Sequence, residues 1–149
     1  MATEYKSKHG IVSRTPYELF MTFADLSNFQ RMLPEDKRQA VKADYDTLSA
    51  SVKGIDIGVK VSERVPYSKI QLVDWGAPFA FMAEIHFDSV SDRPNATDFH
   101  IVFNAELNLM MKMMIGGKIK DALDKVVDGL VSASEGRMPE GFDPSQFGV

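Results

Sequence analysis

Two histidines are the residues of this chain whose type and spacing could support metal chemistry. His86 and His100 alternate with the apolar residues of two long segments, so both point away from the buried face. If Phe87 pairs with Phe99 in an antiparallel sheet, the two histidines face each other across neighbouring strands. The carboxylates that would then lie nearby are those of Glu84, Asp88 and Asp98. A register shift of two residues removes this pair, and exposed strand positions often carry polar side chains, so we predict no metal site.

General acid–base catalysis needs a titratable side chain beside the substrate, and few candidates point inward. Asp74 shares the alternation of Ile70 and Leu72, although a strand that ends there would leave it in water. Tyr45 and His9 are the other candidates. Each is better explained as a core or rim residue with satisfied polar groups, and either could orient the polar end of a ligand without catalysis. The chain has no phosphate-binding loop, dinucleotide fingerprint, zinc-protease motif or nucleophile elbow. We therefore predict no catalytic residue and no cofactor.

The elements that position these side chains follow from the hydrophobic alternation. A first strand is predicted over Tyr5–Ser13, with Gly10 as a bulge. A meander of strands is predicted over 43–52, 55–65, 69–76, 79–90 and 97–109. The last two strands point only apolar side chains inward, which are Phe79, Phe81, Ala83, Ile85 and Phe87, then Phe99, Ile101, Phe103, Ala105, Leu107 and Leu109. Neither strand supplies an acid, a base or a nucleophile to the buried face.

Two short helices are predicted directly after the first strand. Thr15, Pro16 and Glu18 form the start signal of the first helix, in which threonine caps, proline takes the first position and glutamate completes a capping box. The second helix starts near Asp25 to Ser27 and is ended or bent by Pro34.

A long amphipathic helix is predicted from Met111, where the apolar spacing changes to three and four residues. Its start is rich in flexible methionines, which either line the mouth of a cavity or fill the core; they are Met110, Met111, Met113 and Met114. The pair Gly116-Gly117 has three interpretations: a kink, a close approach to the sheet, or a helix that begins only after Gly117.

Composition narrows the class of protein. A chain of 149 residues is the length of one domain. The absence of cysteine excludes disulfides and thiolate sites, and a net charge of −4 disfavours nucleic acid as a partner. No apolar run reaches the ~20 residues of a membrane span, and the first ten residues lack the apolar core of a secretory signal. We expect a cytoplasmic protein.

The order of elements resembles the helix-grip fold of the SRPBCC superfamily, which includes START lipid-transfer domains, birch-pollen-allergen-like proteins and bacterial polyketide cyclases. The resemblance covers about residues 5–133, and its most specific parts are RTPYELFMTFADLSNFQRMLP and LNLMMKMMIGGKIKDALDKVV. It implies an α+β domain over 1–134, in which a curved antiparallel sheet of about six strands wraps a long C-terminal helix. The segment 135–149 is then an irregular tail, which many such domains lack.

The resemblance also implies an apolar cavity between the sheet and the last helix, but it supplies no universal catalytic motif. The first hypothesis is therefore binding of a small hydrophobic ligand or lipid, for transport or sensing. The residues predicted to line the cavity are Leu72, Phe81, Ile85, Ile101, Phe103, Met111, Met114, Ile115 and Leu123. A polyketide cyclase-like enzyme and a protein-interaction module with a packed interior are the alternatives.

Overall fold

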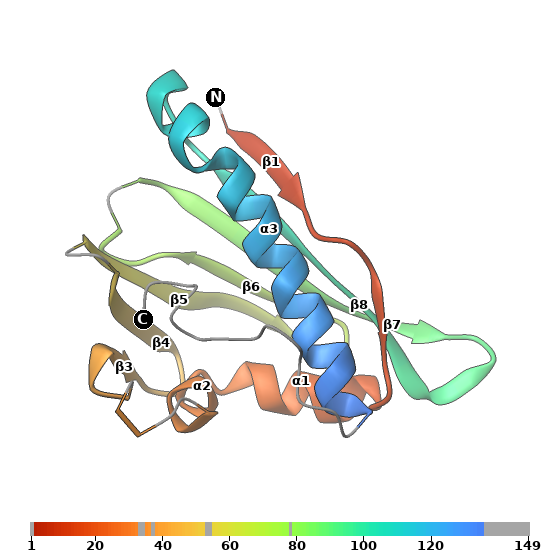
Figure 1. Ribbon diagram of the computed structural model, residues 1–149. Coiled ribbons are helices and arrows are strands. Elements are labelled where there is room, and N and C mark those ends of the chain that lie inside the picture. Colours follow the sequence, from red (N-terminus) through yellow and green to blue (C-terminus); the bar gives the residue numbers. More distant parts are fainter. Residues whose placement is uncertain (1, 33–34, 37, 53–54, 78, 136–149) are drawn as a thin grey trace.

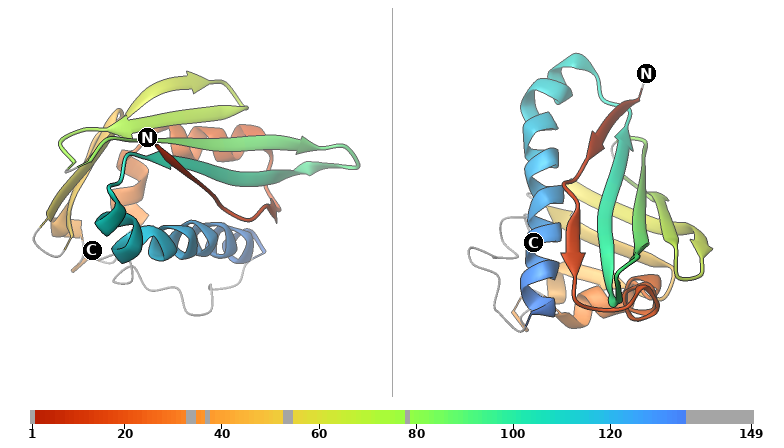
Figure 2. Two further views of the ribbon diagram at one scale, coloured as in Figure 1. Left: turned by 90° about the horizontal axis from the view of Figure 1, so that it is seen from above. Right: turned by 90° about the vertical axis from the view of Figure 1, so that its right-hand side faces the viewer.

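The protein folds as one curved antiparallel sheet that wraps one side of a long helix (Figure 1). The computed structural model describes residues 2–32, 35–36, 38–52, 55–77 and 79–135. Seven of the eight strands described follow the order β1-β8-β7-β6-β5-β4-β3, and the eighth, β2, pairs with β8. The last helix, α3 (Leu109–Ser134), lies along the hollow side of the sheet (Figure 2). The predicted helix-grip architecture is confirmed, with eight strands where about six were expected.

The predicted first strand is two strands, β1 (Thr3–Lys6) and β2 (Gly10–Val12), which both pair with β8 (Arg93–Ala105). Ser7 lies between these two strands and bonds to Ile101 of β8. Its backbone N–H donates to the Ile101 carbonyl at 2.9 Å, and its side-chain hydroxyl accepts from the Ile101 N–H at 2.8 Å. Gly10 follows this irregularity and faces α3. A Cβ atom at that position would lie 2.5 Å from Val127 Cγ1, so glycine permits the helix to approach the sheet closely.

The two short helices are α1 (Pro16–Ala24) and α2 (Ser27–Met32). The capping box of α1 is confirmed: Thr15 Oγ1 accepts from the Glu18 N–H at 3.1 Å, and Glu18 Oε1 accepts from the Thr15 N–H at 3.4 Å. Pro34, which was expected to end the second helix, lies outside the described residues. The helix pair closes one end of the space between the sheet and α3 (Figure 1).

The meander differs from its prediction mainly at strand ends. The single strand predicted over 43–52 is replaced by two strands, β3 (Val41–Ala43) and β4 (Thr47–Val52). A short 3₁₀ helix, η1 (Arg38–Ala40), precedes them. The Asp44 side chain makes the turn by accepting from the N–H groups of Asp46 and Thr47 at 3.0 and 2.7 Å. The next strands are β5 (Ile55–Val65), which matches its prediction, β6 (Lys69–Asp74) and β7 (Phe81–Val90).

The last strand ends at Ala105, four residues earlier than predicted, because Asn108 caps α3. Its side-chain oxygen accepts from the Met111 N–H at 2.8 Å, so the helix starts at Leu109. Leu109 was predicted to point inward from the strand and is instead 75% exposed. The helix continues through Gly116 and Gly117, which excludes the late start after Gly117.

Candidate functional site

The inner face of the sheet and α3 enclose two apolar clusters that differ in how completely they are buried. The closed-end cluster lies beside α1, and its buried members are Val12, Leu19, Phe20, Phe23, Ala24, Ile70, Ile85, Phe87, Phe99, Ile101 and Val127. The open-end cluster lies beside the first half of α3, where Phe81, Ala105 and Leu107 are buried. Nine further members of that cluster keep part of their surface exposed, and they are Tyr5, Ile57, Val59, Ala77, Phe79, Phe103, Met111, Ile115 and Ile119.

Eight of the nine residues predicted to line a cavity belong to these clusters. Ile85, Ile101, Leu72 and Leu123 lie in or against the closed-end cluster. The open-end cluster holds Phe81, Phe103, Met111 and Ile115. Met114 does not join them: it is 65% exposed, because the face of α3 that meets the sheet carries Met111, Ile115 and Ile119 at four-residue spacing. Its predicted place between sheet and helix is therefore corrected.

Of the four methionines at the start of α3, only Met111 takes one of the predicted roles. Met111 packs in the open-end cluster, as core or lining. Four other apolar side chains at the first turns of α3 are exposed to solvent; they are Leu109, Met110, Met113 and Met114. The sequence pattern could not separate these roles, because only the phase of the helix distinguishes them.

Gly116 lies on the inner side of the same helix. A Cβ atom there would come within 2.9 Å of the Tyr5 hydroxyl oxygen, whereas a Cβ atom on Gly117 would meet nothing within 4 Å. Of the three interpretations of the glycine pair, a close approach therefore holds for Gly116. It also places the Tyr5 hydroxyl, a polar group, at the open-end cluster.

The three polar candidates from the sequence occupy different places. Asp74 pairs with Val59, which points into the open-end cluster, and Asp74 Oδ1 accepts a hydrogen bond from the Phe81 N–H at 3.1 Å. Tyr45 is exposed and its ring lies 4.1 Å from the Arg64 guanidinium carbon. His9 is on the outer face of the sheet. Asp74 therefore faces the cluster but accepts a backbone hydrogen bond, whereas Tyr45 and His9 do not point inward.

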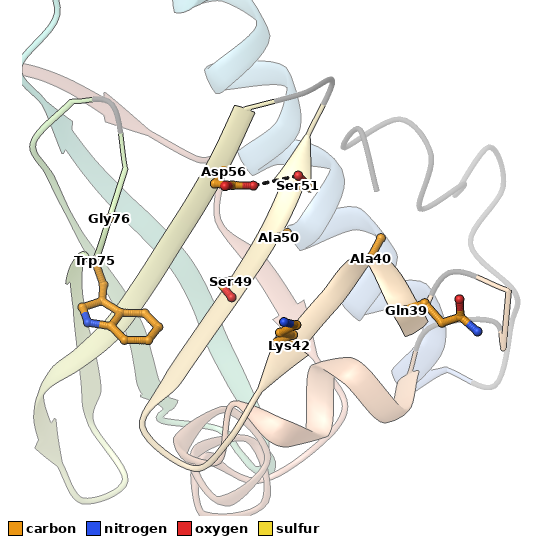
Figure 3. Close-up of a pocket in the computed structure, with 9 residues that line it drawn as sticks. All are labelled: Gln39, Ala40, Lys42, Ser49, Ala50, Ser51, Asp56, Trp75 and Gly76. Carbon is orange, nitrogen blue, oxygen red and sulfur yellow. Dashed lines mark hydrogen bonds between the residues drawn. The ribbon is translucent and has the colours of Figure 1, made fainter.

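A separate hollow of about 550 Å³ lies on the outer face of β3, β4 and β5 (Figure 3). Asp56 and Gly58 alternate with the inward residues Ile57 and Val59, which places this hollow opposite α3. The half-exposed Trp75 flanks it, and the Ser51 hydroxyl donates to Asp56 Oδ1 at 2.7 Å (Figure 3). Its other lining residues are Gln39, Ala40, Lys42, Ser49, Ala50 and Gly76. The lining is therefore mixed, with polar groups such as Lys42 and Asp56 beside apolar ones such as Trp75.

The histidine pair predicted across the last two strands is confirmed. Phe87 pairs with Phe99, His86 pairs with His100, and the two imidazole rings stack with centroids 4.6 Å apart. The structure adds His9, whose ring stacks on the other side of His100 at 4.2 Å. Burial lowers the pKa of His100, the neighbouring His9 and His86 lower it further, and Asp88 and Asp98 partly oppose the shift.

No family model and no curated protein matches this sequence, whereas solved structures do. A START superfamily protein from Mycobacterium smegmatis superposes with a TM-score of 0.56 and 13% identity, over 87% of this chain and 98% of that chain. Norcoclaurine synthase from Thalictrum flavum gives 0.58 and 10% identity, over 85% and 87% of the two chains. The protein has the helix-grip fold.

A third helix-grip structure shows how widely this fold is used. An HSP90 activator from Plasmodium falciparum superposes with a TM-score of 0.51 and 18% identity, over 80% of this chain and 89% of that chain. An enzyme, a START protein and an activator of a chaperone thus share one architecture, so the fold by itself does not select a function. Among the helices described, none is long and apolar enough to cross a membrane.

Proposed function

We propose that this protein binds a small hydrophobic molecule or lipid between the sheet and the first half of α3. The observation that carries the proposal is the open-end cluster, in which nine apolar members keep part of their surface exposed. In the closed-end cluster eleven members are buried and seven are partly exposed, whereas in the open-end cluster three are buried and nine are partly exposed. A well-packed domain buries such side chains, so an apolar surface left open on the inner face favours an apolar occupant.

The affinity of this site comes from the removal of apolar surface from water. Each square ångström of apolar surface that the ligand and the cluster bury contributes about 25 cal/mol. The Tyr5 hydroxyl, which lies against Gly116, is positioned to orient a polar end of the ligand. Met111 adapts to different apolar shapes because its side chain is flexible and polarizable.

An enzyme on the same fold is the second hypothesis, and it needs an acid or base beside the ligand. The inward residues of β7 are apolar, as are those of β8 from Phe99 to Ala105. Asp74 is the carboxylate nearest to the open-end cluster by register, but its Oδ1 already accepts the Phe81 N–H. The apolar inward faces of β7 and β8 favour binding without catalysis, and Asp74 and the Tyr5 hydroxyl are the groups that a cyclase-like reaction would have to use.

The test fills the proposed site with a larger side chain. Ile115→Trp and Phe103→Trp occupy the space that the ligand would take, and we expect each to weaken binding of the dye anilinonaphthalene sulfonate by roughly tenfold, which corresponds to about 1.4 kcal/mol. Met113→Trp adds the same indole to the same helix at an exposed position, so its affinity should stay within about twofold of the wild type. Fluorescence titration measures all three.

Folded variants of Ile115 and Phe103 that bind the dye as tightly as the wild type would contradict this placement. Native mass spectrometry of freshly purified protein complements the titration. A discrete apolar molecule that co-purifies with the wild type and is lost from Ile115→Trp supports the carrier function, and a molecule retained by that variant argues against the site.

A further inference from the structure

All three histidines of the chain lie in one row across the outer face of the sheet. His86 is on β7, His100 is its partner on β8, and His9 immediately precedes β2, where Gly10 pairs with Phe99. The rings stack in that order, at 4.6 Å between His86 and His100 and 4.2 Å between His100 and His9. This outer-face histidine row is on the side opposite the open-end cluster, because Phe87 and Phe99 point inward.

Two carboxylates lie directly beside the row. Asp88 and Asp98 are partners on β7 and β8, and like charges in such facing positions repel each other. His9 Nδ1 lies 2.9 Å from Asp98 Oδ1, and His100 Nδ1 lies 3.8 Å from Asp88 Oδ2. Among the described residues, the ion pairs that involve these two carboxylates are with histidines and not with lysine or arginine. A bound cation would relieve the repulsion between them.

We propose that His9, Asp98 and His100 form a binding site for one divalent transition-metal ion, such as Zn²⁺. Their ligand atoms all lie within 4.8 Å of one another. Two imidazole nitrogens and one carboxylate oxygen are a donor set that suits zinc, copper, nickel or cobalt and does not suit magnesium or calcium. The set leaves a fourth coordination position open to water or to a further ligand.

Side-chain rotation completes the geometry, because the stacked rings of His9 and His100 must turn so that each directs a nitrogen lone pair at the metal. Metal–nitrogen bonds of 2.0–2.1 Å place tetrahedral ligands roughly 3.4 Å apart, whereas the ligand atoms here lie within 4.8 Å of one another and His9 Nδ1 is 2.9 Å from Asp98 Oδ1. His9 can make this movement because its side chain is 60% exposed. His100 is held more firmly, and its buried Nδ1 has no hydrogen-bond partner. A metal ligated by that nitrogen would satisfy a buried polar atom that makes no hydrogen bond and lies 3.8 Å from Asp88 Oδ2.

The site lies at the His9 end of the row and not at the His86 end. The β6 partner of His86 is Lys69, whose ammonium pairs with Glu84 at 3.3 Å and with Glu63 at 3.7 Å. The residues whose ligand atoms lie within 4.8 Å of one another do not include His86, whereas Asp98 Oδ1 lies 2.9 Å from His9 Nδ1. His86 is therefore a neighbour of the site and not one of its ligands.

The composition makes this proposal unusually easy to test. The 149 residues contain no cysteine and no histidine outside the row, so imidazole ligation by this chain can come only from these three side chains. The experiment needs protein without a polyhistidine tag, treated with a chelator and then dialysed. Isothermal titration with ZnCl₂ at neutral pH should give saturable binding of one ion per chain, and MgCl₂ should give none.

Three variants assign the ligands. His9→Gln and His100→Gln should each raise the dissociation constant for zinc by at least tenfold, and Asp98→Asn by about tenfold. His86→Gln removes a histidine of the same row and should change it by less than about threefold, which makes it the matched control. Far-ultraviolet circular dichroism and thermal unfolding establish that each variant is folded.

Two results would overturn the assignment. Wild-type protein that shows no saturable zinc binding up to about 1 mM has no such site. If His86→Gln weakens binding as much as His9→Gln, the ligand set proposed here is wrong. Neither result bears on the hydrophobic site, because that site is on the other face of the sheet and is tested with an apolar dye.

Discussion

At the scale of single residues, Asp124 joins α3 to the bend between β1 and β2. Its Oδ1 accepts from the Lys8 backbone N–H at 2.7 Å, and Lys120 donates to both of its carboxylate oxygens at 2.9 and 2.8 Å. Burial acts to raise the pKa of Asp124, but the hydrogen bonds from Lys120 and Lys8 and their charges outweigh it, so the pKa is lowered. The ionised carboxylate therefore favours the folded state.

This shift predicts a pH-dependent contribution to stability. Because the pKa of Asp124 is lower in the folded than in the unfolded chain, its contribution is fully present above the ordinary value of 3.8 and is lost as the pH falls through the folded value. Asp124→Asn should reduce the free energy of unfolding by about 1 kcal/mol at pH 7. Urea unfolding across the acidic range should show the difference from wild type shrinking below pH 3.8.

The matched control is Asp121→Asn, an exposed position on the same helix. It should leave the free energy of unfolding within about 0.5 kcal/mol of the wild type. A penalty for Asp124→Asn that stays constant at all pH values would mean that the carboxylate charge does not stabilise the fold.

At the scale of secondary-structure elements, α3 carries two adjacent glycines with opposite surroundings. Gly117 is exposed in open space, so Gly117→Ala should stabilise the protein by about 1 kcal/mol through helix propensity alone. Gly116→Ala gains the same propensity, but its methyl group meets the Tyr5 hydroxyl oxygen at 2.9 Å. We expect this variant to be less stable than wild type by about 1 kcal/mol, because Tyr5 or the helix must move.

Thermal unfolding of the two alanine variants measures this contrast directly. Equal stabilisation by both would show that α3 is not held close to β1 at Gly116. A stabilised Gly116→Ala that also binds the hydrophobic dye less well would instead locate Tyr5 within the ligand site.

At the scale of the whole molecule, packing is uneven along the space between sheet and helix. Val12 on β2 is fully buried in the closed-end cluster, whereas Val59 on β5 keeps part of its surface exposed in the open-end cluster. Val12→Ala should cost about 2 kcal/mol of unfolding free energy, since it removes two fully buried methyl groups. Val59→Ala should cost about half as much.

The two valine variants also respond differently to the ligand. A ligand that binds only the folded protein raises its apparent stability by mass action. Saturating dye should therefore raise the unfolding temperature of Val12→Ala as much as that of the wild type, and that of Val59→Ala less. Equal costs and equal shifts for both valines would mean that the two ends are packed alike.

The sequence by itself determined the local structure of this protein. Alternating apolar residues specified β5 over its full length and the inward faces of β7 and β8, because side chains of a strand alternate between its two faces. The Thr15–Glu18 capping box specified the start of α1 by a short-range hydrogen-bond pattern. The same alternation placed His86 and His100 on the outer face, but it did not choose between registers that differ by two residues; the structure pairs Phe87 with Phe99 and His86 with His100.

Only the tertiary structure decided which distant residues meet. His9 joins His100 because β2 returns to the edge of β8, and nothing within either segment encodes that pairing. The phase of α3 separates Met111 from Met114, since a capping side chain at Asn108 sets where the helix begins. The contrast between a mostly buried end and a mostly half-exposed end depends on how the sheet, α1 and α3 pack in three dimensions. A buried phenylalanine and a pocket phenylalanine follow the same pattern along the chain.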